Sequence, residues 1–237
     1  MIHVNRGAYP TTHILELPTT RPSWTGVRTI LHLFADTGSD SWPYRIDPRY
    51  DVITVGADIG VENYHPDRPI WGVIANPVCT DLTPAKHGKQ FGGGERPARD
   101  LDTAFGHVRE ALRVIDEAQP RWHAIENPAS GLMRQFLGKP DFSYEPWQFG
   151  SPWTKRTALW GSFTNPTPIY TRWEDVPLNP DIYVRPGRRP SMAWLHKSAF
   201  DVIPEFRDSG MPAPTSDMEL RSLCSQGFAH AFKEANP

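Results

Sequence analysis

The sequence predicts an α/β fold in which a mainly parallel sheet carries helices on both faces. Four short apolar runs that stop at polar, Gly or Pro residues are typical of buried strands, at residues 28–34, 51–55, 71–75 and 122–125. A strongly amphipathic stretch, residues 101–118, separates the third run from the fourth. Strand, helix and strand in this order imply a crossover between parallel strands.

The amphipathic stretch has clear end signals. Asp100 precedes it and suits a helix N-cap, while Pro120 follows it and stops the helix. Its apolar residues recur at three- and four-residue spacing, so they share one face. A short second helix is expected over residues 227–235, and irregular structure is expected over residues 1–27 and about 161–220.

Composition sets limits on the class of protein. A chain of 237 residues suits one ordinary domain, and a net charge of -2 excludes a strongly basic protein while leaving room for a local basic strip that binds nucleic acid. The two cysteines, Cys79 and Cys224, make no disulfide framework, which indicates a reducing, cytoplasmic setting. No apolar stretch approaches the roughly 20 residues of a membrane helix, and no signal peptide or metal site is expected.

Two reactive side chains follow apolar runs, each close to a proline. Cys79 ends the block 76–79 (NPVC), and Glu126 opens the block 126–128 (ENP). Ligands bind at the carboxyl ends of parallel strands, so this thiol and this acid are expected to meet around one substrate ring. Each also has an ordinary reading, because most free cysteines are small buried hydrophobes and a strand-end glutamate often pairs or caps.

A thiol and an acid in one pocket suit addition to carbon 6 of a cytosine. The acid protonates N3 of the ring, which withdraws electron density from carbon 6 and allows a thiolate to add there.

The loop after the first run is a candidate cofactor site. A strand that feeds a glycine turn brings backbone against a nucleoside cofactor, although a plain strand-to-helix connection has the same pattern. The loop consists of Phe34, Ala35, Asp36, Thr37, Gly38 and Ser39. Asp58, beyond the second run, suits a hydrogen bond to ribose or adenine, or equally a turn or helix cap.

Cations gather at three further places. The loop that contains glycines 92–94 suits a segment that moves and touches phosphate, or a disordered surface loop. Adjacent cations after a proline turn suit phosphate binding, support of a base pocket, or a solvated turn. The cations in question are Lys86, Lys89, Arg96 and Arg99 around the glycines, Lys155 and Arg156 after the turn, and Arg188 and Arg189 in the proline-rich stretch.

In sequence order, these motifs resemble the small, phage-type branch of the DNA cytosine-C5 methyltransferases. The resemblance spans about residues 28–236, and its most specific parts are the blocks 126–134 (ENPASGLMR), 149–161 (FGSPWTKRTALWG) and 221–232 (RSLCSQGFAHAF). It implies a Rossmann-like, S-adenosylmethionine-dependent methyltransferase sheet with a small irregular insert. The implied division is a lead-in at 1–27, a catalytic core at 28–160, a reduced recognition-like insert at 161–220 and a C-terminal segment at 221–237 that packs back on the core.

The resemblance also implies roles for individual residues. Cys79 would add to carbon 6 and Glu126 would hold N3 of a cytosine flipped out of double-stranded DNA, while S-adenosylmethionine donates a methyl group to carbon 5. Lys155 or Arg156 would take the place of the family's supporting arginine. The cofactor would contact residues 34–39, Asp58, Asn76 and Pro77, and DNA would contact Lys86, Lys89, Arg96, Arg99, Arg188 and Arg189.

Three departures from the family pattern keep alternatives open. Asp36 stands where glycine is usual, Val78 separates Pro77 from Cys79, and the insert has only about 60 residues, so a partner is a possible source of sequence specificity. The alternatives are transfer of a different group to carbon 5, an amino-methyltransferase for which the block 76–79 is a faint match, and a catalytically degenerate protein that binds nucleic acid. Cys79 stands where an amino-methyltransferase needs a stacking aromatic residue. The oligomeric state and the DNA target are left open.

Overall fold

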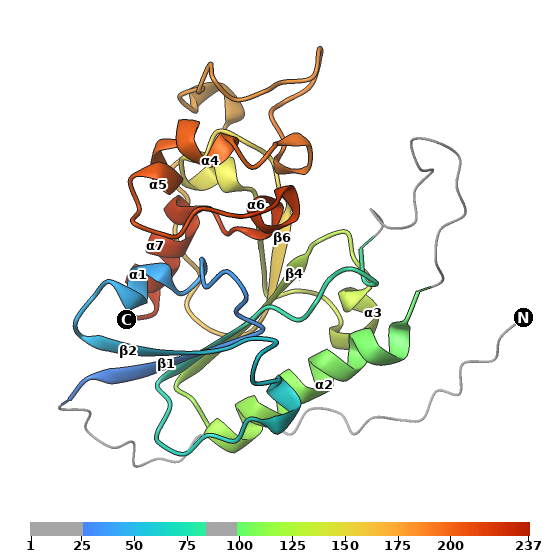
Figure 1. The fold of residues 1–237 in the computed structure, drawn as a ribbon, viewed down its shortest axis with the longest axis vertical. Coiled ribbons are helices and arrows are strands. Elements are labelled where there is room, and N and C mark those ends of the chain that lie inside the picture. Colours follow the sequence, from blue (N-terminus) through green and yellow to red (C-terminus); the bar gives the residue numbers. More distant parts are fainter. Residues whose placement is uncertain (1–25, 84–98) are drawn as a thin grey trace, which may run out of the picture.

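The computed structural model describes residues 26–83 and 99–237, which form a layered arrangement of one sheet with helices on both sides (Figure 1). The strands are β1 (Arg28–Leu33), β2 (Tyr50–Val55), β3 (Gly72–Ala75), β4 (Trp122–Pro128), β5 (Phe142–Tyr144) and β6 (Thr157–Ser162). The helices are α1 (Trp42–Arg45), α2 (Leu101–Ala118), α3 (Met133–Leu137), α4 (Ala199–Val202), α5 (Pro204–Arg207), α6 (Asp217–Ser222) and α7 (Gln226–Ala235). Single turns of 3-10 helix are η1 (Val61–Asn63), η3 (Pro146–Phe149), η4 (Trp173–Asp175) and η5 (Met192–Trp194).

The sheet has the order β2-β1-β3-β4-β6-β5. Strands β1 to β4 are parallel, and β6 runs antiparallel to both of its neighbours. The prediction of a mainly parallel α/β sheet is therefore confirmed, and the antiparallel strand β6 is an addition that the sequence did not indicate. Because the chain leaves β1 for β2 on one side and then returns to β3 on the other, the strand order reverses beside β1. Open α/β sheets bind their ligands at such a point.

Helix α2 covers one face of the sheet, as its pattern predicts. Asp100 caps it by accepting a hydrogen bond from the Thr103 N–H at 3.0 Å, and Gln119 ends it in a left-handed conformation. Its buried side chains pack against the apolar core formed by β1, β3 and β4. Among the residues that the structure describes, no helix combines the length and the apolar character needed to cross a membrane.

Helices α1 and α7 cover the opposite face through aromatic packing. Trp122 stacks on Tyr44 with ring centroids 5.8 Å apart and meets Phe232 edge-on at 5.5 Å. Gly72 makes room for this indole, because a Cβ atom at position 72 would lie 2.2 Å from the Trp122 ring. Residue 72 must therefore be glycine for β3 and β4 to pair with Trp122 between the sheet and α7.

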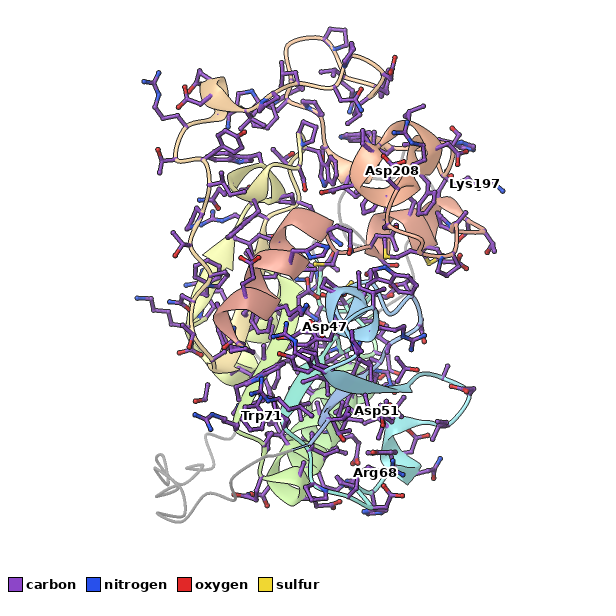
Figure 2. All side chains as sticks on the ribbon, turned by 90° about the vertical axis from the view of Figure 1, so that its left-hand side faces the viewer. Asp47, Asp51, Arg68, Trp71, Lys197 and Asp208 are labelled. Atoms are coloured by element: carbon purple, nitrogen blue, oxygen red, sulfur yellow. The ribbon has the colours of Figure 1, made fainter. Side chains whose placement is uncertain are left out.

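The stretch expected to be irregular contains short helices around an apolar cluster of its own. Met192, Phe206 and Leu220 are among its buried members, and Trp153, from the segment before β6, packs with them. This part lies at one end of the molecule, where Figure 2 labels Lys197 and Asp208, whereas Asp51 and Arg68 mark the far end of the sheet. Glu205 joins the cluster to the core, because its buried carboxyl accepts hydrogen bonds from Ser151 and from the Gly227 N–H.

Replacing Gly72 tests how tightly the indole is seated. We expect Gly72→Ala to lower the free energy of unfolding by about 3 kcal/mol, because the added methyl group must displace Trp122 or the strand. The matched control is Gly106→Ala in α2, where the new methyl group meets nothing within 4 Å. This control should stabilise the protein by up to about 1 kcal/mol through helix propensity. Urea denaturation measures both, and equal effects of the two substitutions would contradict the packing described here.

Candidate active site

Strand register brings three polar segments to one edge of the sheet. Leu33, Ala75 and Ile125 are in register on β1, β3 and β4. The residues that follow them are therefore neighbours at the carboxyl ends of adjacent parallel strands. These are Phe34 and its loop, Asn76, which leads to Cys79, and Glu126.

A buried amide fixes the Cys79 loop beside β4. The Asn127 side chain donates a hydrogen bond to the Pro77 carbonyl oxygen at 2.9 Å. Beyond Pro77, the Cys79 carbonyl oxygen accepts the N–H groups of Leu82 and Thr83, each at 2.9 Å, which closes a turn directly after the thiol. The thiol is thus half-buried on a loop that is pinned on both sides.

Burial dominates the electrostatics of the acid and the thiol. It raises the pKa of Glu126 to about 7, with Lys155 opposing the rise, Asp40 adding to it and the Asn76 amide opposing it. Burial also raises the pKa of Cys79, and the Glu126 carboxylate raises it further while Lys155 lowers it. The charge of Glu126 therefore acts on Cys79, and protonation of Glu126 makes the Cys79 thiolate easier to form.

Asn76 lies at the centre of a polar network around the acid. Its Oδ1 is 2.7 Å from Nε2 of His32, and its Nδ2 donates to Glu126 at 3.1 Å and to Asp40 at 3.2 Å. The sequence predicts Asn76 as a cofactor contact, but both amide hydrogens are used within the protein. Sequence reasoning missed His32 and Asp40, and the one available signal was a histidine inside an otherwise apolar strand.

A small cavity lies behind the acid, between the sheet and α7. Its volume of about 20 Å³ is close to that of one water molecule. Asp40 and Glu126 supply its carboxyl groups, and Cys224 and Phe228 are among its other lining residues. Two carboxyl groups thus border one small cavity whose wall is otherwise apolar.

The loop after β1 has the backbone of a tight turn. Phe34 and Gly38 have positive φ angles of 57° and 65°. Ser39 is fully buried, and its Oγ accepts the Cys224 N–H at 3.0 Å while its carbonyl oxygen accepts Nε2 of Gln226 at 3.1 Å. Ser39 therefore anchors the C-terminal segment, whereas Ala35 and Thr37 are half-buried and Asp36 is exposed.

Asp36 and Asp58 converge at Gly56, just past the end of β2. A Cβ atom at position 56 would lie 3.3 Å from a carboxyl oxygen of Asp36 and 3.2 Å from one of Asp58. Both carboxylates are exposed acceptors at the point where the strand order reverses. Such a pair fits the ribose hydroxyls and the ammonium group of S-adenosylmethionine, which are donors, and so the residues present fit this cofactor.

The two cations that precede β6 differ in their surroundings. The Lys155 ammonium donates to the carbonyl oxygens of Ser222 at 3.1 Å and Leu223 at 2.9 Å, which end α6. From there it lowers the pKa values of both Glu126 and Cys79. Arg156 is exposed at the edge of the sheet. The side chain that carries charge to the site is therefore Lys155.

The expected DNA contacts lie in three places. Lys86, Lys89, Arg96 and the glycines at 92–94 fall outside the described residues. Arg99 donates to the Thr83 carbonyl oxygen at 3.4 Å, beside the turn that follows Cys79. Arg188 and Arg189 are exposed on the insert, where Arg189 lies 4.9 Å above the Trp173 ring.

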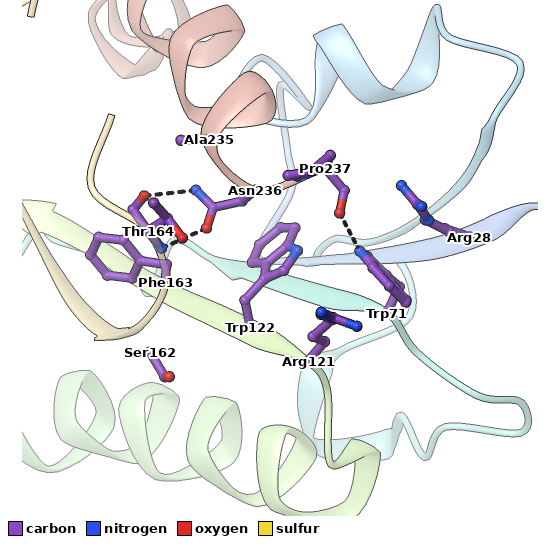
Figure 3. A pocket seen from close by; sticks show the side chains of 10 residues that line it. All are labelled: Arg28, Trp71, Arg121, Trp122, Ser162, Phe163, Thr164, Ala235, Asn236 and Pro237. Carbon is purple, nitrogen blue, oxygen red and sulfur yellow. Dashed lines mark hydrogen bonds between the residues drawn. The ribbon is translucent and has the colours of Figure 1, made fainter. Parts of the chain in front are cut away.

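A larger cavity, of about 520 Å³, lies at the opposite edge of the sheet (Figure 3). The guanidinium groups of Arg28 and Arg121 lie 4.5 and 4.9 Å from the Trp71 ring, and the Trp71 indole donates to the Pro237 carbonyl oxygen at 2.7 Å. Because these residues lie at the amino ends of the parallel strands, this cavity contains neither the thiol nor the acid.

No protein-family model matches this chain, and neither does any curated protein. One solved structure with a similar fold is provisionally described as a DNA modification methyltransferase encoded within a prophage of E. coli. The two chains share 14% sequence identity with a TM-score of 0.38, and the match covers 69% of this chain and 52% of the other. This chain thus spans about half the length of that structure, and a likeness of this size carries no functional argument.

The raised pKa of Glu126 predicts a pH-dependent effect of its neutral analogue. Between the ordinary value of 4.5 and about 7, the folded protein keeps a proton on Glu126 that the unfolded chain has lost, so rising pH favours unfolding. We expect Glu126→Gln to gain stability relative to the wild type, by up to about 3 kcal/mol, as the pH rises from about 5 to about 8. Urea unfolding at several pH values measures this difference, and two parallel stability curves would contradict it.

Proposed function

We propose that this protein is a DNA cytosine-C5 methyltransferase that uses Cys79 as its nucleophile and Glu126 as its acid. The observation that carries the proposal is the pair itself: a half-buried thiol and a carboxyl group with a pKa of about 7, on adjacent parallel strand ends joined by Asn127. An acid that titrates near neutrality can both give and take back a proton at physiological pH.

The pair accounts for each proton and bond of the addition. The Cys79 sulfur forms a bond to carbon 6 of cytosine while the Glu126 proton moves to N3, and the ring electrons shift toward carbon 5. After carbon 5 accepts the methyl group, a base removes the proton on carbon 5 and the bond between sulfur and carbon 6 breaks. The N3 proton returns to Glu126, which restores the aromatic ring, the thiolate and the acid.

S-adenosylmethionine would supply an electrophilic methyl group when bound. Asp36 and Asp58 would accept its hydroxyl or ammonium hydrogens, and the left-handed turn at Phe34 would present backbone to it. The exposed position of Asp36 lets its carboxylate turn toward a donor group and away from the cofactor's own carboxylate.

DNA would enter with the target cytosine rotated out of the helix, because carbon 6 is out of reach within the base stack. Arg99 beside the Cys79 turn, together with the exposed arginines of the insert, would neutralise phosphates. The net charge of -2 indicates that such contacts are local. The amino-methyltransferase alternative is less favoured, because Cys79 offers no ring on which a base can stack.

Covalent trapping tests the nucleophile. On DNA that contains 5-fluorocytosine, with S-adenosylmethionine present, we expect the protein to form an adduct that survives denaturation, because fluorine at carbon 5 blocks the final elimination. The adduct should be lost in Cys79→Ser and kept in Cys224→Ser, which removes the buried second thiol. Gel electrophoresis and mass spectrometry detect it. An absent adduct, or one that survives Cys79→Ser, would refute the assignment.

Replacing the acid tests the role of Glu126. We expect Glu126→Gln to lower turnover at least 100-fold while changing the DNA dissociation constant less than threefold, because the amide fills the site but transfers no proton to N3. Glu110→Gln on α2, where the carboxylate pairs with Arg113, is the control and should leave turnover unchanged. Equal losses of turnover and DNA affinity in Glu126→Gln would instead assign Glu126 to DNA binding. Mass spectrometry of the cytosines also identifies the group that is transferred.

A further inference from the structure

We propose that His32 is a positioning residue that acts through Asn76, so that the Asn76 amide donates to Glu126 and Asp40 at once and holds the acid in place for N3. The inference rests on the proposed function and assigns roles to three residues that sequence reasoning either missed or placed elsewhere. It stands on the contacts of the buried network at the carboxyl ends of β1 and β3.

Only one orientation of the Asn76 amide satisfies its neighbours. The two atoms within reach of Nδ2 are carboxyl oxygens of Glu126 and Asp40, which accept hydrogen bonds whenever they are ionised. A flipped amide would turn its oxygen toward both of them, and each acid would then need a proton of its own. The observed orientation lets one amide satisfy two carboxylates.

His32 fixes this orientation from the other side. The ring is fully buried, and burial lowers its pKa, so it is neutral and carries one N–H. Since Oδ1 of Asn76 can only accept, Nε2 of His32 is the donor across the 2.7 Å contact. Nδ1 is then an acceptor. The Ser41 hydroxyl lies 2.8 Å from it and 3.2 Å from the Gly38 carbonyl oxygen, and its single hydrogen goes to the nearer acceptor, Nδ1. A chain of donors therefore runs from Ser41 through His32 and Asn76 to the acid.

The network also balances the charge state of Glu126. The hydrogen bond from the Asn76 amide favours the ionised form of Glu126. The charge of Asp40, which is bonded to the same amide, disfavours that form. Lys155 faces Glu126 from the residues before β6, Cys79 from the loop after β3, Tyr144 from β5, and Cys224 from the residues before α7. Among all the groups that face Glu126, only Asn76 and Asp40 belong to the His32 network. Loss of the Asn76 hydrogen bond should raise the pKa of Glu126, and loss of the Asp40 charge should lower it.

The test measures the rate of adduct formation on 5-fluorocytosine DNA as a function of pH. We expect His32→Leu to slow adduct formation at least tenfold and to move the upper pH limit of activity to higher pH, since Glu126 loses the bond that favours its charged form. His32→Gln keeps a donor that can reach Asn76 and should recover most of the rate. Asp40→Asn should move the same limit to lower pH.

A merely structural role for His32 would lower the amount of folded protein without moving the pH limit. Carbon-13 NMR of labelled glutamate carboxyl groups, without DNA, follows the Glu126 titration directly and should show the same two opposite shifts. The relay would be overturned if the wild type forms the adduct but Glu126 titrates at the same pH in the wild type, His32→Leu and Asp40→Asn. If His32→Leu does not fold, an unshifted Asp40→Asn alone overturns it. An absence of wild-type adduct would instead refute the proposed function, while the NMR shifts still decide the relay.

Discussion

Parallel pairing of β1, β3 and β4 in strict register is the constraint on which the rest of the structure depends. Because Leu33, Ala75 and Ile125 are in register, the residues that follow them lie side by side at the carboxyl ends of the strands. A slip of one residue in any strand would turn its buried side chains to the other face. Gly72 protects this register, since the Trp122 indole lies directly against it on β3. Packing at one end of the strands therefore sets the relative positions of Asn76 and Glu126 at the other end.

The electrostatic cost of burying Glu126 is offset only in part by its neighbours. Glu126 gains one amide donor from Asn76 and the field of Lys155, which is less than a fully ionised buried carboxylate requires, and its pKa of about 7 reflects the remainder. Asp47 shows the opposite case at the surface, where hydrogen bonds to Arg49 and Lys233 lower the pKa of its carboxyl group. The contrast shows that the pKa of Glu126 is raised because burial is its largest influence and the Asn76 hydrogen bond and Lys155 offset that influence only in part.

The sequence predicted the elements that have regular patterns and missed those that depend on contacts. Uniform apolar runs located β1 to β4, and the cap at Asp100 with three- and four-residue spacing located α2. Strand β5 has only three residues and β6 contains Gly161 at a φ of 142°, so neither carries a usable period. The same holds for the site. Cys79 and Glu126 stand out beside prolines, whereas Asp40 and His32 acquire a role only when Asn76, 36 and 44 residues away, folds against them.

The position of Lys155 links two parts of the molecule mechanically. Its backbone belongs to the approach to β6, but its ammonium is held by the last carbonyl oxygens of α6, at the border of the short-helix cluster. The same ammonium sets part of the electric field at the thiol and at the acid. A shift of α6 would move this charge and so change the pKa values of Cys79 and Glu126. The short-helix cluster and the edge of the sheet that holds Cys79 and Glu126 are therefore connected through one charged side chain.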